Sequence, residues 1–217
     1  MENKMNGIKA AIFDLDGVIC FTDMYHYQAW KKLAGRLGIY FDEKINNRLR
    51  GVSRADSLEI ILERSDIIYD DQEKLAFCEE KNETYVKLLD NMTEADLSDE
   101  VKKTLDELRS RGYLLAIGSS SRNAKKILGR IGLDDYFDAI SDGTNISRSK
   151  PDPEVFIKAA EMLNLKPEEC MVVEDAIAGI DAAYAGGFAS AGLGEAAGYE
   201  KTDNPLDSFG DLAKILS

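Results

Sequence analysis

The sequence predicts an α/β protein in which a doubly wound parallel sheet forms the core and an all-helical cap domain is inserted into it. Three observations support this fold class. The apolar run 8–13, broken by one lysine, is typical of a strand buried on both faces of a parallel sheet. From residue 99 onward, short apolar segments alternate with helical periodicity. Residues 21–91 show helical periodicity alone, which indicates the insert.

Two carboxylates follow the first predicted strand. Asp14 and Asp16 lie where that strand ends in a loop that Gly17 allows to turn. Ligands of open α/β sheets bind beyond the carboxyl ends of the strands. No basic residue stands beside these acids in the sequence, so they require an outside cation or a shared proton. We interpret the pair as half of a magnesium-dependent site.

Two other interpretations of this segment are a surface turn and a calcium loop. Asp and Gly are common in turns, so residues 10–19 alone leave the first one open. A calcium loop requires an oxygen ligand at its fifth position and glycine at its sixth. Val18 and Ile19 occupy those positions, which excludes it.

Composition excludes several classes of protein. The formal net charge of −13 argues against nucleic acid or an anionic membrane as a partner, and it means that a phosphorylated substrate needs local positive charge. No apolar run has the ~18 residues of a membrane helix, and residues 1–9 are too polar for a signal peptide. Cys20, Cys78 and Cys170 are odd in number and far apart, which suits reduced thiols. We therefore expect a cytoplasmic protein.

The length of 217 residues exceeds the roughly 100–200 of a typical domain, so it allows a core with an insert. We expect a Rossmann-like catalytic core made of 1–20 and 92–217, and a helical cap domain at 21–91. Helical spacing and capping patterns predict cap helices at 25–37, at 42–49, from the capping box 53–56 onward, and at 70–89.

The α/β pattern resumes after the insert. Helices are predicted at 99–111, 122–131, 153–164, 176–185 and 207–216. The third of these has Pro153 in its first position and Asp152 as its N-cap. Strands are predicted at 113–118, 137–141, 170–173 and 188–191, and no strand is evident after Gly194. Glycines 192, 194 and 198 do not form a dinucleotide-binding fingerprint, because the third is one residue late and all lie far from the first strand.

Polar groups follow three of the predicted strands. Ser119 follows strand 113–118, and Glu174 and Asp175 follow strand 170–173, as Asp14 and Asp16 follow the first. Taken alone, the pair Glu174-Asp175 fits a solvated loop or an N-cap as well as it fits a metal site. Three such coincidences at one sheet edge favour a shared site, and oxygen ligands without His or Cys suit Mg²⁺.

Ser119 and Lys150 have the chemistry to bind a phosphoryl group. Ser119 precedes a predicted helix start, where hydroxyl and N–H groups suit an anion. Lys150 precedes Pro151, which holds its backbone extended. Together with Mg²⁺ they would supply the charge that phosphoryl transfer requires. One acid of the first motif can act as nucleophile and the other can carry the proton, and the residues alone do not say which.

The segments 13–19, Ser119, 150–153 and 174–175 resemble, in order and spacing, the four motifs of the haloacid dehalogenase superfamily. The resemblance implies that Asp14 is the nucleophile and Asp16 the general acid/base. It also implies that Mg²⁺ is held by Asp14, the main-chain carbonyl of Asp16, Glu174 and Asp175. The resemblance further implies that the Lys150–Pro151 bond is cis.

Segments 25–30, 49–58, 81–87 and 118–123 are similar to the hexose-phosphate mutases of this superfamily. This resemblance implies isomerisation of β-glucose 1-phosphate to glucose 6-phosphate, with glucose 1,6-bisphosphate as activator and intermediate. It implies that the cap residue His26 hydrogen-bonds the acid/base when the cap closes, and that Arg54 holds the distal phosphate. Arg54 lies in the first turn of a helix, where a bound phosphate would offset the unfavourable macrodipole. The implied substrate-binding residues are His26, Trp30, Arg50, Gly51, Arg54, Ser57, Lys81, Ser120, Ser121, Arg122 and Asn123.

Departures from the family pattern leave other functions open. Cys20-Phe21 replaces a polar residue and an acid at the first cap hinge, and Arg50 and Arg122 replace lysines. A sugar-phosphate phosphatase would share all four core motifs, with water in place of the sugar hydroxyl as acceptor. A non-catalytic sugar-phosphate binder would not need a nucleophile. We expect a monomeric enzyme whose partner is a small phosphosugar, with no nucleic-acid or membrane partner.

Overall fold

The computed structural model describes residues 7–49 and 53–216. The chain divides into two compact units, which are described separately. The core unit comprises Met1–Phe21 and Thr93–Ser217, and the helical unit comprises Thr22–Met92. Within the described part of the chain, no helix combines the length and the apolar character needed to cross a membrane.

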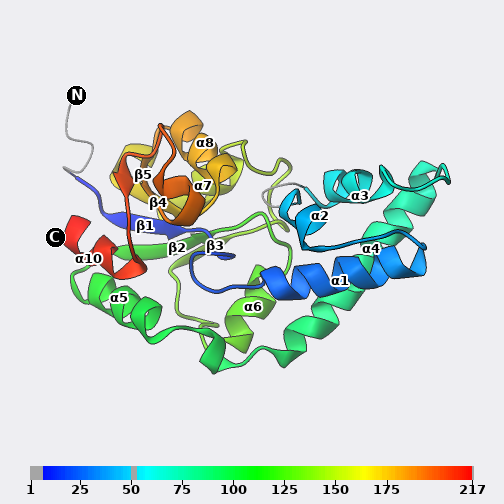
Figure 1. The fold of residues 1–217 in the computed structure, drawn as a ribbon. Coiled ribbons are helices and arrows are strands. Elements are labelled where there is room, and N and C mark those ends of the chain that lie inside the picture. Colours follow the sequence, from blue (N-terminus) through cyan, green and yellow to red (C-terminus); the bar gives the residue numbers. More distant parts are fainter. Residues whose placement is uncertain (1–6, 50–52, 217) are drawn as a thin grey trace. The chain divides into compact units, whose positions relative to one another are not determined.

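The core unit contains one parallel sheet (Figure 1). Its strand order is β3-β2-β1-β4-β5-β6, so β1 lies between β2 and β4. The register places Ala10 opposite both Leu114 and Cys170. This topology confirms the predicted doubly wound sheet. The strands are β1 (Ala10–Phe13), β2 (Leu114–Gly118), β3 (Ala139–Ser141), β4 (Cys170–Glu174), β5 (Ala189–Gly192) and β6 (Asn204–Pro205).

Strand β1 is apolar throughout because both faces of the sheet are covered. Ile12 packs in a buried cluster with Phe156 and Phe188. Phe13, on the opposite face, stacks on Phe209 with ring centroids 5.7 Å apart. The helices of this unit are α5 (Asp99–Ser110), α6 (Ala124–Arg130), α7 (Glu154–Met162), α8 (Ile177–Gly186), α9 (Gly194–Ala197) and α10 (Leu212–Ile215), with 3₁₀ turns η2 (Glu94–Asp96), η3 (Pro167–Glu169) and η4 (Phe209–Asp211).

Several predictions for the core unit were wrong in detail. The helix predicted at 207–216 is the 3₁₀ turn η4 followed by the shorter helix α10. The sheet does have a strand after Gly194, because β6 pairs with β5, but it has two residues, one of them proline, and therefore no alternation to detect. Helix α7 begins one residue later than predicted, with Pro153 and not Asp152 as its N-cap. The Pro153 carbonyl accepts the first helical hydrogen bonds, while Asp152 Oδ1 accepts the N–H of Glu154 at 3.0 Å.

The helical unit contains α1 (Asp23–Arg36), α2 (Glu43–Asn47), α3 (Arg54–Leu62), α4 (Asp71–Leu88) and the 3₁₀ turn η1 (Leu89–Asn91). Its buried cluster includes Trp30, Leu33 and Leu58. The predicted cap at Ser53 is present, because its hydroxyl accepts the N–H of Asp56 at 3.2 Å. The start of α4 is fixed by a capping box at Asp70. Arg50 and Gly51, two predicted binding residues, lie outside the described residues.

The helical unit offers a matched test of its core. Leu33 in α1 is 1% exposed and Leu75 in α4 is 62% exposed. We predict that Leu33→Ala lowers the free energy of unfolding by about 2–5 kcal/mol, because it leaves a cavity. Leu75→Ala should change it by less than about 0.5 kcal/mol. Urea unfolding followed by circular dichroism measures both, and equal losses would contradict the packing described.

Candidate active site

The carboxyl ends of three adjacent strands bring together three of the predicted catalytic and metal-binding residues. Asp14 follows β1, Ser119 follows β2, and Glu174 is the last residue of β4. The N–H of Asp14 donates to the carbonyl of Val173 at 2.9 Å, which continues the pairing of β1 with β4 up to the acid. The order β2-β1-β4 therefore places Asp14 between the other two.

Lys150 joins two of these acids. Its Nζ donates to Glu174 Oε1 at 2.6 Å and also hydrogen-bonds Asp14 Oδ1, and it lies 4.7 Å from the ring centroid of Phe156. The three charged side chains are almost fully buried, with exposed fractions of 10% for Lys150, 10% for Asp14 and 2% for Glu174. The bond between Lys150 and Pro151 is cis, as expected.

Burial and charge act in opposite directions on this cluster. Burial alone would lower the pKa of Lys150, but the carboxylates of Asp14 and Glu174 outweigh it and raise that pKa, so the lysine stays protonated. Burial also raises the pKa of Asp14 well above its ordinary value; Lys150 opposes this shift and Glu174 adds to it. A further cation beside Asp14 would favour its ionised form.

Glycines make room for the acids that follow β4. Glu174 Oε2 accepts the N–H groups of Asp175 and Ala176, each at 2.9 Å. A Cβ at Gly179 would lie 1.9 Å from Glu174 Oε1. Gly17 has φ +89°, and its Cβ would lie 2.1 Å from Asp175 Oδ2. Both positions therefore require glycine if the carboxylates are to stay where they are.

Asp14, Glu174 and Asp175 could hold a metal ion. Each offers an oxygen, and these oxygens lie within 4.8 Å of one another. Three carboxylates with one lysine leave uncompensated negative charge, and an all-oxygen donor set suits Mg²⁺. Among the described residues Asp16 is not part of this carboxylate group. The resemblance assigns only the main-chain carbonyl of Asp16 to the metal, and this assignment stays a prediction.

The loop after β2 folds back on itself. Ser119 is buried, its N–H donates to the Ser141 carbonyl at 3.1 Å, and its hydroxyl accepts the N–H of Ser121 at 3.2 Å. Helix α6 starts at Ala124, two residues later than predicted, so Arg122 and Asn123 belong to this loop. Further hydrogen bonds hold the loop, from Asn123 N–H to Ser121 Oγ, from Arg122 Nε to the Gly143 carbonyl, and from Lys150 N–H to Ser120 Oγ.

The helical unit brings together another group of predicted residues. Lys81 is 3% exposed, and its Nζ lies 2.7 Å from His26 Nδ1 and 5.0 Å from the ring centroid of Trp30. Burial, together with the charges of Lys81 and Arg54, holds the pKa of His26 well below its usual range.

Arg54 and Ser57 lie on α3. Arg54 Nη2 donates to Asn82 Oδ1 at 2.9 Å, and Ser57 is buried. Tyr85 was not among the predicted site residues, yet its ring centroid lies 4.0 Å from that of His26. Its position four residues after Lys81, on the same face of α4, is the signal that could have found it.

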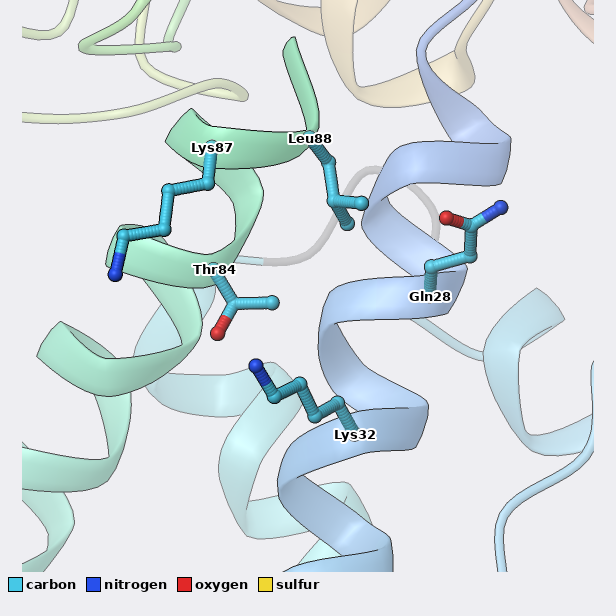
Figure 2. A pocket seen from close by; sticks show the side chains of 5 residues that line it. All are labelled: Gln28, Lys32, Thr84, Lys87 and Leu88. Carbon is cyan, nitrogen blue, oxygen red and sulfur yellow. The ribbon is translucent and has the colours of Figure 1, made fainter. Parts of the chain in front are cut away.

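A pocket of about 340 Å³ lies between α1 and α4 of the helical unit. It is lined by Gln28, Lys32, Thr84, Lys87 and Leu88. Figure 2 shows Lys32 pointing toward Thr84, whereas Lys87 and Gln28 point outward. Because its polar groups do not converge, we assign no ligand to this pocket.

The glycine beside Glu174 supplies a test of the metal site. Gly179→Ala should displace the Glu174 carboxylate and weaken Mg²⁺ binding, measured by calorimetry, by about tenfold or more. Gly35→Ala in α1 is the matched control, because a Cβ there meets nothing within 4 Å. Equal Mg²⁺ affinity in the two variants would contradict this account of the site.

Comparison with known proteins places the chain in a family. The chain is 42% identical to a β-phosphoglucomutase of Bacillus subtilis over 87% of this chain and 84% of that protein. It is 32% identical to a phosphorylated carbohydrates phosphatase of Thermotoga maritima, over 83% of this chain and 82% of that protein. The crystal structure of a β-phosphoglucomutase from Clostridium difficile matches with a TM-score of 0.86 at 40% identity, covering 94% of this chain and 93% of that one. The model of the haloacid dehalogenase-like hydrolases matches residues 8–187, and the chain belongs to this family of enzymes.

Proposed function

We propose that this enzyme is a phosphotransferase that isomerises β-D-glucose 1-phosphate to D-glucose 6-phosphate. The observation that carries the proposal is the buried group of Asp14, Lys150 and Glu174 at the strand ends, which suits a carboxylate nucleophile. The likeness to β-phosphoglucomutases over most of the chain supports the choice of substrate.

Asp14 acts as nucleophile in this proposal. The cycle starts from the aspartyl-phosphate on Asp14, which glucose 1,6-bisphosphate supplies. The 6-hydroxyl of β-glucose 1-phosphate attacks its phosphorus, the bond from phosphorus to the Asp14 oxygen breaks, and Asp16 takes the hydroxyl proton, so that β-glucose 1,6-bisphosphate forms as the intermediate. An Asp14 oxygen then forms a bond to the phosphorus at C1 while the bond from that phosphorus to the sugar oxygen breaks, and Asp16 gives its proton to that oxygen. Lys150 and Ser119 stabilise the oxygens of the transferring group.

Mg²⁺ is the metal that we propose for this site. Asp14, Glu174, Asp175 and the carbonyl of Asp16 would hold it. When bound, it would neutralise charge on the transferring phosphoryl group. The fit rests on the three converging carboxylates and their excess negative charge over one lysine.

The helical unit is proposed to act as the cap. Its His26, Trp30 and Lys81 form one cluster, and Arg54 is the candidate for the distal phosphate. A closed cap would exclude water, so that a sugar hydroxyl accepts the phosphoryl group. The remaining proposed substrate contacts are Arg50, Gly51, Ser57, Ser120, Ser121, Arg122 and Asn123.

A sugar-phosphate phosphatase is the second candidate, favoured by the likeness to the Thermotoga phosphatase. It would use the same Asp14 and Lys150, with water as the final acceptor. A non-catalytic binder is disfavoured, because binding alone does not need a buried nucleophile. We further propose that the enzyme works as a monomer in the cytoplasm; three unpaired cysteines suit a reducing compartment.

Product analysis separates the two candidates. With β-glucose 1-phosphate, Mg²⁺ and a trace of glucose 1,6-bisphosphate, we predict glucose 6-phosphate with little free phosphate. A parallel reaction with excess chelator should stop turnover. Stoichiometric release of phosphate would contradict the mutase and support the phosphatase.

Conservative variants test the division of labour between the two acids. Asp14→Asn should lower kcat by roughly a thousandfold or more, because the nucleophile is lost. Asp16→Asn should lower it by about 10²–10⁴-fold, since only proton transfer is lost. Asp135→Asn is the matched control, because Asp135 is an exposed acid of the core unit. Asp14→Asn with the kcat of this control would refute the nucleophile assignment.

A further inference from the structure

Tyr85 connects two helices of the helical unit from a fully buried position. It lies in α4 with 1% of its surface exposed, and its hydroxyl donates to Thr22 Oγ1 at 3.0 Å. A buried phenol without a partner is unfavourable, so this bond fixes the ring at its polar end.

Thr22 is also the start of α1. Its carbonyl accepts the N–H of His26 at 3.1 Å, and its own side chain makes no capping bond to the helix. The hydroxyl of Tyr85 is therefore bonded to the residue that holds the backbone of His26. This contact joins the start of α1 to the C-terminal part of α4.

The ring of Tyr85 lies against the imidazole of His26. The ring centroids are 4.0 Å apart and the planes are 30° apart. Lys81 lies beside both, 4.7 Å from the Tyr85 centroid and 2.7 Å from His26 Nδ1. A protonated lysine has only donors, so His26 Nδ1 must accept and the imidazole proton must be on Nε2.

The charges around His26 keep it neutral. Lys81 comes from α4 and Arg54 from α3, and both act with burial to lower its pKa. Among the described residues, Nδ1 has Lys81 as its partner and no bond is seen for Nε2. His26 therefore presents an N–H donor whose direction depends on how the ring is held.

We propose that Tyr85 is a positioning residue, whose ring, anchored on Thr22, sets the orientation of the His26 imidazole and so aims its Nε2–H. The proposal rests on the proposed function, in which that N–H serves the acid/base during phosphoryl transfer. Tyr85 itself touches His26 and Lys81 and acts through them.

His26 is the only histidine of the chain, so its imidazole signals are unambiguous in ¹⁵N–¹H NMR. In the wild type we expect the Nε2–H tautomer and a pKa below the usual value of about 6.5. Tyr85→Leu removes the ring; we expect mixed tautomers, a pKa closer to the usual value, and a kcat lower by about tenfold with KM little changed. Tyr85→Phe keeps the ring and loses the anchor, so its shifts should be smaller but in the same direction.

Two controls make the result decisive. Tyr40→Phe removes the hydroxyl of an exposed tyrosine of the same unit, bonded to Asp42, and should leave the His26 signals unchanged. Thr22→Val should reproduce Tyr85→Phe, and the double variant should add nothing further. Wild-type tautomer and pKa in Tyr85→Leu, or in Tyr85→Phe if Tyr85→Leu does not fold, would overturn the proposal. The NMR result holds whether the enzyme proves to be a mutase or a phosphatase, so the two proposals fail separately.

Discussion

The site depends on one buried ammonium group. Lys150 pairs with both Asp14 and Glu174 at the ends of adjacent strands, where little of any of the three side chains is exposed. Two carboxylates could not remain ionised at this depth without a compensating charge. The cis bond to Pro151, the hydrogen bond from Lys150 N–H to Ser120 and the contact with Phe156 all belong to the segment that delivers this lysine.

Charge balance also explains which residues surround Lys150. Once Lys150 is shared by two acids, Asp175 adds a third carboxylate and leaves the site negative, which a divalent cation would balance. Gly179 and Gly17 give the acids room. In the helical unit, a second buried lysine, Lys81, has aromatic rings and an imidazole as its neighbours where Lys150 has carboxylates. It is held by the aromatic faces of Trp30 and Tyr85 and by a neutral imidazole. The carboxylate group of the core unit therefore carries excess negative charge, whereas Lys81 and Arg54 supply positive charge beside His26 in the helical unit.

Patterns among neighbouring residues predicted much of the fold and of the site. They could not predict contacts between residues that are far apart in the sequence. The apolar run before Asp14 and the N-cap at Ser53 depend on neighbouring residues, and both are confirmed. The two-residue strand β6 carries no periodicity, so it was missed. The partners Lys150 and Asp14 are 136 residues apart, and Tyr85 and Thr22 are 63 apart. Such contacts are set by the topology; the sequence predicted that Lys150 serves the phosphoryl group, but its hydrogen bond to Asp14 comes from the structure.

The most direct test of the account is to locate the transferred phosphoryl group. The enzyme, incubated with Mg²⁺ and β-glucose 1,6-bisphosphate, is quenched in acid, digested and analysed by mass spectrometry. The account predicts a phosphoryl group on Asp14 that is lost at neutral pH. Phosphorylation of any other residue in place of Asp14, or none under turnover conditions, would contradict it.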